Sequence, residues 1–177
     1  MTLSDESAIT KWLVRADADG PTADTLGARF ASSQTAPAGA LVLGVRPGEW
    51  IIVGAAGEVA AATADLDGLD SGEFTSALDW THGRAMYRVT GHEATRMLEK
   101  VCGIDWSDHM TPDGAVLSAS VALVTCDIAR NDVSHDETAS TPSYLILCDR
   151  SFGQYLFDAL IDAGNEFGLT VPAGGVS

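Results

Sequence analysis

Residues 41–53 hold two apolar runs separated by a turn. The runs at 41–45 and 50–53 flank Arg46-Pro47-Gly48, and turn residues between two apolar runs predict a β-hairpin. The alanine-rich stretch that follows, 57–69, predicts a short helix that ends at Gly68 in an acidic loop.

Residues 84–90 alternate in polarity with a period of two, which predicts a strand. One face would carry Ala85, Tyr87 and Val89, and the other would carry Arg84, Met86 and Arg88.

A helix is predicted directly after this strand. Thr90 can cap it, because Glu93 stands three residues later at the spacing of a capping box, and Gly103 can end it. Its apolar positions keep helical spacing: Ala94, Met97, Leu98, Val101 and Cys102.

The last third of the chain predicts more strands and one helix. Residues 115–130 predict one or two strands and 143–149 another, while 131–142 is a polar loop without structure of its own. Ser151 can cap a final helix that Gly168 ends. Its apolar stripe is Phe152, Tyr155, Leu156, Ala159, Leu160, Ala163 and Phe167.

This order, roughly ββα followed by βαβββα, predicts an α+β fold. We expect a mixed or antiparallel sheet with helices packed on one face. Residues 1–38 are rich in Ala, Asp, Ser, Thr and Pro and predict an extended N-terminal arm with one short element near 8–14. Residues 39–170 would form one domain, which two lobes at 39–75 and 76–170 could divide, and 171–177 would be a tail.

The charge of the chain restricts its partners. Its 177 residues include 25 acidic and 10 basic side chains, a net charge of −15, which argues against nucleic acid and anionic membranes. No apolar run approaches the roughly 20 residues of a membrane span, and the polar, acidic N-terminus lacks the layout of a signal peptide. We therefore expect a cytoplasmic protein. Residues 81–104 are an exception in charge, because four basic and two acidic side chains leave them at plus two.

No catalytic, cofactor-binding or metal-binding residues are predicted on this chain. Cys102, Cys126 and Cys148 lie in apolar stretches and are expected to be buried thiols in a reducing compartment. The four histidines lack the spacing of a zinc site.

Two motif-like stretches also favour ordinary structure. Gly54-x-x-Gly57 lacks one glycine of a dinucleotide turn, and Glu58 would place a carboxylate at the diphosphate position. Residues 65–73 are acidic but fail the spacing of an EF-hand.

Five residues are candidates for contact with another protein. Trp12 would stand on the arm, where it could anchor an interface or pack back onto the domain. A sheet face with Arg84, Met86 and Arg88 suits a protein partner, although an exposed sheet face needs none. Lys100 adds to the same cationic segment.

Four segments, in order, resemble the gamma subunit of heterotetrameric sarcosine oxidase, which is related to the folate-binding domain of the glycine-cleavage aminomethyltransferase. They are PGEWIIV at 47–53, LDWTHGRAMYRVTG at 78–91, KVCGID at 100–105 and RSFGQYLFDALIDAGNEFG at 150–168. The resemblance covers about 40–168. This sequence departs from the family at 7–9 and 117–118, and 131–142 reads as an insertion.

The resemblance implies an aminomethyltransferase-like fold and a non-catalytic structural subunit. It implies partner subunits alpha, beta and delta that hold NAD and tetrahydrofolate, FAD and covalent FMN, and zinc. Such a complex oxidises sarcosine or a related N-methyl amine and transfers the one-carbon unit to folate. The cationic segment would then dock onto an acidic face of a larger subunit.

Two alternatives remain open. The chain could be a small folate-binding or one-carbon-transfer protein that acts alone, as the related aminomethyltransferase domain suggests. It could also belong to a dehydrogenase for a different N-methyl amine.

Overall fold

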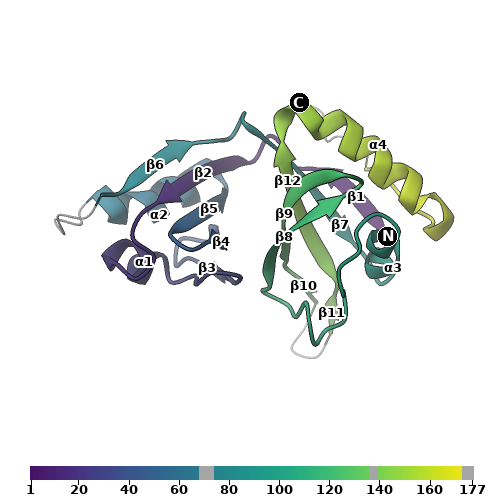
Figure 1. Cartoon of the computed structure of the whole chain (residues 1–177), viewed down its shortest axis with the longest axis horizontal. Coiled ribbons are helices and arrows are strands. Elements are labelled where there is room, and N and C mark those ends of the chain that lie inside the picture. The colour runs from purple at the N-terminus through teal and green to yellow at the C-terminus, as the bar shows by residue number, and fades with distance from the viewer. Residues whose placement is uncertain (68–73, 136–138, 173–177) are drawn as a thin grey trace. The chain divides into compact units, whose positions relative to one another are not determined.

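The chain folds into two compact units. The computed structural model describes residues 1–67, 74–135 and 139–172. Unit 1 contains Met1–Ala8 and His82–Ser177, and unit 2 contains Ile9–Thr81. Each unit is built on its own five-stranded sheet (Figure 1), and the paired strands of both sheets run antiparallel. The predicted α+β class is confirmed.

The sheet of unit 2 has the strand order β3-β4-β5-β2-β6. The predicted hairpin and the alanine-rich helix are confirmed as β4, β5 and α2. The elements are β2 (Thr10–Arg15), α1 (Pro21–Leu26), β3 (Ser33–Thr35), β4 (Leu41–Arg46), β5 (Glu49–Gly54), α2 (Ala56–Asp67) and β6 (Ser76–Asp79). The expected helix end at Gly68 and most of the acidic stretch 65–73 lie outside the described residues.

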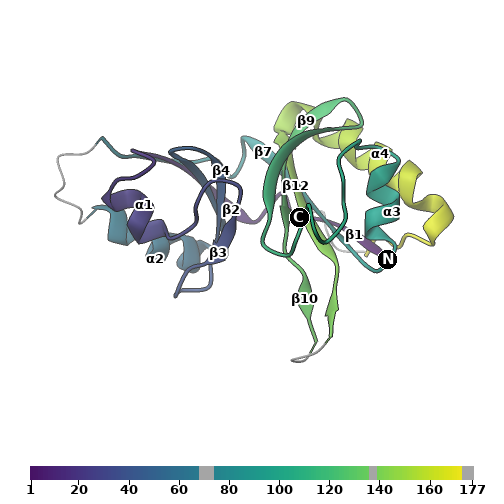
Figure 2. The same ribbon diagram turned by 60° about the horizontal axis from the view of Figure 1, so that its bottom comes forward.

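One face of this sheet packs against α1 and α2 (Figure 2). The buried core between the helices and that face consists of Val14, Leu26, Ala28, Ala40, Val42, Trp50, Ile52, Val59 and Leu66. The indole N–H of Trp50 donates to the carbonyl of Ala28 at 2.7 Å, which satisfies the one polar atom of this large side chain.

The prediction of an extended N-terminal arm is wrong, although the short element expected near 8–14 is present as β2. Residues 2–5 form β1 in unit 1, and residues 10–15 form β2, which lies between β5 and β6 in the sheet of unit 2. In each of these two segments, polarity alternates over too few residues to give a clear strand signal. Their partners lie more than 30 residues away in sequence, so tertiary pairing decides their conformation.

The sheet of unit 1 has the order β1-β7-β12-β9-β8. The predicted strand at 84–90 is confirmed as β7, and 115–130 forms a hairpin of two strands. The elements are β1 (Thr2–Asp5), β7 (Arg84–Thr90), α3 (Ala94–Glu99), β8 (Val116–Val121), β9 (Val124–Arg130), β10 (Val133–Ser134), β11 (Ser140–Thr141), β12 (Ser143–Asp149), the 3₁₀ turn η1 (Arg150–Phe152), α4 (Gly153–Gly164) and η2 (Asn165–Phe167).

Helices α3 and α4 supply one side of the core of unit 1, and the sheet supplies the other. Ala85, Tyr87 and Val89 face this core, as the alternation predicts, and the Tyr87 and Phe157 rings lie 5.2 Å apart. The α4 stripe is narrower than predicted. Leu156, Leu160 and Ala163 are buried, whereas Phe152 and Tyr155 are exposed.

The predicted helix caps are wrong at both helices of unit 1. α3 begins after Glu93, because the Thr90 hydroxyl is hydrogen-bonded to the Ser143 hydroxyl at 2.9 Å and Gly91, at φ 143°, turns the chain. α4 has no cap from Ser151, since Arg150–Phe152 forms a 3₁₀ turn before it. A cross-strand partner thus displaces the cap of α3, and a local 3₁₀ turn displaces that of α4.

The polar segment 131–142 is also more ordered than predicted. Val133–Ser134 pairs antiparallel with Ser140–Thr141, and His135 Nε2 lies 2.8 Å from the Thr141 hydroxyl. This short ladder extends beyond the main sheet (Figure 2). Residues 136–138 lie outside the described residues.

Gly44 on β4 marks a close approach between two backbone segments. A Cβ atom at this position would lie 2.1 Å from the carbonyl oxygen of Arg29. The segment 29–32 is bound to Gly44 on both sides, because Ala31 N–H donates to the Gly44 carbonyl and Gly44 N–H donates to the Ser32 carbonyl, each at 2.9 Å.

We expect Gly44→Ala to destabilise the chain by about 2–3 kcal/mol, because backbone rather than a movable side chain blocks the new methyl group. Gly57→Ala is the matched control. It lies in α2 with nothing within 4 Å of its Cβ position, and should stabilise by about 0.5–1 kcal/mol. Urea unfolding followed by tryptophan fluorescence measures both. Equal effects of the two substitutions would contradict the close approach.

Candidate interaction site

Arg84 joins four strands of the unit 1 sheet. Its Nη2 donates to Asp127 Oδ2 on β9 at 2.5 Å, and its Nη1 donates to Asp149 Oδ1 on β12 at 2.8 Å. Asp127 also accepts from the Ser118 hydroxyl on β8 at 2.6 Å. Arg84 and Asp127 are both buried. A paired and hydrogen-bonded guanidinium of this kind holds strands in register.

Arg88 connects the N-terminal segment to the same sheet. Its Nε donates to Glu6 Oε1 at 2.8 Å, and its Nη1 donates to the Ser143 hydroxyl at 3.1 Å and to the Asn131 side-chain oxygen at 3.3 Å. Arg84, Met86 and Arg88 do share the face of β7 opposite the helices, as predicted. Met86 is buried, and both cations have carboxylate partners within unit 1.

Lys100 lies at the surface, just after α3. Its Nζ pairs with Glu166 at 2.7 Å, donates to the Ala163 carbonyl at 3.2 Å and stands 5.6 Å from the centre of the Phe167 ring. The guanidinium of Arg96 lies 5.3 Å from the centre of the same ring. These contacts attach α3 to the end of α4 and leave both cationic groups accessible.

Trp12 lies on a strand and not on an arm. It pairs with Ile52 and Asp79 in β2 and packs, half-buried, against the helix-side core of unit 2. The five candidate residues therefore come from both units. Arg84, Met86 and Arg88 share one strand face, whereas Lys100 lies just after α3 and Trp12 belongs to unit 2.

Arg130 is a cationic residue that the sequence does not single out. Its Nη1 donates to Asp108 at 2.6 Å and to the Thr111 carbonyl at 2.7 Å, and its Nε and Nη2 each donate to Asp132 at 3.0 Å. Hydrogen bonds to Asp132 raise the pKa of Arg130, burial opposes this rise, and Asp108 adds to it. The hydrogen bond from Arg130 to Asp108, 22 residues earlier in the chain, becomes visible only in the folded structure.

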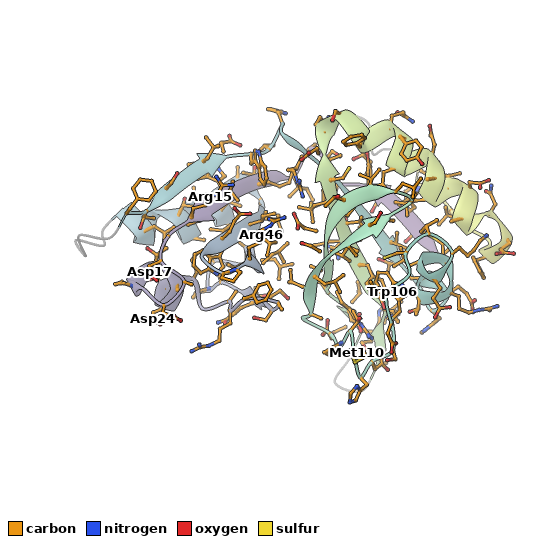
Figure 3. The ribbon with its side chains drawn as sticks, in the orientation of Figure 1. Arg15, Asp17, Asp24, Arg46, Trp106 and Met110 are labelled. Atoms are coloured by element: carbon orange, nitrogen blue, oxygen red, sulfur yellow. The ribbon has the colours of Figure 1, made fainter. Side chains whose placement is uncertain are left out.

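The Arg130 cluster holds the segment 105–113 against the sheet. The Trp106 ring stands edge-on to the Tyr144 ring at 5.2 Å, and the Arg130 guanidinium lies 5.8 Å from the same Tyr144 ring. Figure 3 shows Trp106 and Met110 in this segment. Each of the three guanidinium nitrogens of Arg130 donates at least one hydrogen bond, so the cluster suits a structural role.

The three cysteines are buried and free, as predicted. Burial raises the pKa of Cys126 to about 12 and that of Cys148 to about 11, and it also raises the pKa of Cys102. The thiolate is the reactive form, so these thiols are poor nucleophiles near neutral pH.

A cavity of about 570 Å³ lies in unit 2 beside α1 and the β4–β5 turn. Figure 3 labels two residues of its lining, Asp24 and Arg46. Charges of both signs line it, and Arg46 is already paired with Glu49. Burial raises the pKa of Glu49, but hydrogen bonds from Arg15 and Arg46 outweigh it and lower that pKa overall. Arg46 is thus held by a carboxylate of its own unit.

The strand-to-helix turn after β5 carries a carboxylate at the start of α2, as predicted. The Glu58 carboxylate accepts from the backbone N–H of Ala55 at 2.9 Å and so occupies the start of α2. Within 1–67, 74–135 and 139–172, no three His, Cys, Asp or Glu side chains are grouped to hold a metal ion. None of the helices in those ranges is long and apolar enough to cross a bilayer.

Solved structures show what this fold is similar to. No protein-family model matches the chain, and no curated protein matches it. A chain of heterotetrameric sarcosine oxidase from Corynebacterium sp. U-96, in complex with pyrrole 2-carboxylate, matches with a TM-score of 0.74 and 21% identity. The match covers 97% of this chain and 87% of that one.

A second match is the glycine cleavage system aminomethyltransferase T from Bartonella henselae. Its TM-score is 0.65 at 14% identity, over 96% of this chain. The match covers 47% of the aminomethyltransferase, so this chain spans about half of that protein's length. The chain therefore has an aminomethyltransferase-like α+β fold.

Arg84→Met should destabilise the chain by about 3 kcal/mol, because it leaves the buried Asp127 carboxylate without its cation. The matched control is Arg96→Met, which removes an exposed ion pair and should cost about 0.5 kcal/mol or less. Urea unfolding measures both. Similar losses for the two variants would show that the Arg84–Asp127 pair does not stabilise the sheet.

Alkaline pH should destabilise unit 1. Burial raises the pKa of Cys126 to about 12 from 9.0, that of Cys148 to about 11 from 9.0, and that of Tyr87 to about 12 from 10.0. The unfolded chain loses these protons first, so stability is full below about pH 9 and falls as pH rises toward 12. The loss should reach about 3 kcal/mol by pH 10. Unfolding curves from pH 7 to 11 measure it.

Cys148→Ala is the control for this pH dependence. It removes one of the titrating groups, so the slope of stability against pH between 9 and 11 should become smaller by about one proton. A wild-type stability that stays flat up to pH 11 would contradict the shifted thiol and phenol groups.

Proposed function

We propose that this chain is a non-catalytic accessory subunit, of the gamma type, in a flavoenzyme complex of the sarcosine oxidase kind. The observation that carries the proposal is the fold likeness to a chain of heterotetrameric sarcosine oxidase over almost the full length of both chains. The four sequence segments at 47–53, 78–91, 100–105 and 150–168 support it independently, since they occur in the family's order.

The ionisable groups of unit 1 are consistent with a structural subunit. Arg84, Arg88 and Arg130 are engaged by carboxylates of the same unit, and the buried thiols keep their protons near neutral pH. A catalytic acid, base or nucleophile needs instead a group that is free to reach a substrate.

The proposed complex oxidises sarcosine or a related N-methyl amine and passes the one-carbon unit to tetrahydrofolate. In this proposal the cofactors FAD, FMN and NAD, as well as tetrahydrofolate and zinc, are bound by the alpha, beta and delta partners. This chain contributes contacts with those partner subunits.

The proposed subunit contact includes Trp12, Arg84, Met86, Arg88 and Lys100, and these residues differ in how directly they can act. The side chain of Arg84 is 8% exposed, that of Arg88 is 24% exposed and that of Lys100 is 42% exposed. Charge reversal at Arg84 or Arg88 would break internal ion pairs before it tested docking. Lys100 is the residue of this set at which charge reversal reports most directly on a partner, because its own ion pair with Glu166 is exposed and contributes little to stability.

A second candidate function is a small folate-binding or one-carbon-transfer protein that acts alone. The likeness to aminomethyltransferase T favours it, although this chain spans only about half of that protein. Titration of the isolated chain with tetrahydrofolate distinguishes the two. The accessory-subunit proposal expects no saturable binding to the chain by itself.

Capture of the tagged chain from its native host should recover larger chains in a fixed ratio, with the visible absorption of a flavin. The recovered complex should oxidise sarcosine or a related N-methyl amine. Oxygen uptake, compared with reduction of an artificial electron acceptor, then separates an oxidase from a dehydrogenase. Recovery of a colourless, solitary chain would overturn the accessory-subunit proposal.

A further inference from the structure

Unit 1 presents three large apolar side chains to solvent near the β8–β9 turn and the start of α4. Leu123 is 92% exposed, Tyr155 is 53% exposed and Phe152 is 50% exposed. The Tyr155 hydroxyl donates to the carbonyl of Ala122 at 3.1 Å, which places its ring beside the turn. Phe152 precedes Tyr155 by three residues in one continuous helical segment, so the two are neighbours on its surface. We name these three residues the Leu123 patch.

The backbone under Leu123 is unusual for the residues it carries. Val121 pairs with Val124, so Ala122 and Leu123 alone form the turn, with φ values of 45° and 69°. Two-residue turns with both φ values positive favour Asn-Gly, because most residues other than Gly, Asn and Asp are strained at positive φ. Burial of the Leu123 side chain does not offset this strain, because that side chain is almost fully in solvent. Strain kept at an exposed position points to a function.

Neighbouring elements hold the turn in place. The Ala122 N–H donates to the Val101 carbonyl at 2.8 Å, directly after α3, and the Ala122 carbonyl accepts from Tyr155. Leu123 is therefore presented by a backbone fixed from two sides. A side chain held in this way loses little freedom when a partner binds it.

Carboxylates follow the patch along α4. Asp158 follows Tyr155 by three residues and Asp162 follows by seven, and α4 contains no Lys or Arg. The one basic residue of the helical segment 150–164 is Arg150, two residues before Phe152. On a chain with a net charge of −15, this border favours a partner surface with Arg or Lys at the matching positions.

We infer that the Leu123 patch anchors a larger protein subunit through an apolar socket that is bordered by Arg or Lys. This inference rests on the proposed function, because the partner is then another subunit of the same complex. Leu123 would enter the socket, Phe152 and Tyr155 would cover its edge, and Asp158 and Asp162 would meet the cationic border.

Leu123→Asn tests the anchor without a loss of folding. Asparagine tolerates a positive φ and suits this turn, so the free energy of unfolding should stay the same or rise. The apolar anchor is lost, so the affinity for the partner assembly recovered with the wild-type chain should fall about tenfold or more. Purified partner assembly titrated with each variant gives the two dissociation constants.

Met110→Gln is the matched control, because Met110 is also an exposed apolar side chain of unit 1 but lies in the segment 105–113. It should leave the affinity unchanged. Asp158→Asn combined with Asp162→Asn should slow association and reduce its dependence on salt, since charges at the border steer the encounter.

The outcomes separate this inference from the proposed function. Equal binding by the wild-type chain and Leu123→Asn would overturn the anchor and leave the accessory-subunit role intact. Failure of the wild-type chain to recover any partner would overturn both. Self-association of the pure chain that Leu123→Asn abolishes would overturn a hetero-subunit contact, because a second copy would then occupy the patch.

Discussion

The architecture depends on the pairing of two N-terminal strands with strands formed by later residues. β2 pairs with β5 on one side and with β6 on the other, so the unit 2 sheet is complete only when residues 10–15 meet strands more than 30 residues away. β1 likewise pairs with β7, about 85 residues later. Both sheets therefore need residues from the first fifteen, and unit 1 combines two separate stretches of the chain, Met1–Ala8 and His82–Ser177.

Within unit 1, the scarce cations act as cross-strand ties. Arg84, Arg88 and Arg130 each hold two or more segments by hydrogen bonds to carboxylates or carbonyls. A chain with 25 acidic side chains gains most from a cation where it can be buried against a carboxylate, because a partner in a low dielectric strengthens the pair. The positive segment at 81–104 is thus largely explained by folding, which leaves less of its charge for a partner.

The surface of unit 1 offers an apolar contact at the Leu123 patch, whereas the charge pattern suggests a contact through the cationic segment 81–104. Leu123, Phe152 and Tyr155 place apolar area in solvent on a fixed backbone, beside the carboxylates of α4. Such a combination of a rigid apolar anchor and a charged border is common at protein interfaces. It agrees with the proposed role of this chain as a subunit that contacts other chains, and it leaves the internal ion pairs of β7 undisturbed.

The sequence by itself determined the elements whose signal is local. The apolar runs around Arg46-Pro47-Gly48, the alternation of 84–90 and the buried part of the α4 stripe follow from periods of two and of about 3.6 residues. Tertiary structure alone decided the rest. The place of β2, the partners of Arg84 and Arg130, the displaced helix caps and the exposure of Phe152 and Tyr155 depend on residues far apart in the chain. Neither Ala122 nor Leu123 is a typical turn residue, so the sequence gives no turn signal there. The pairing of Val121 with Val124 imposes the backbone of the turn.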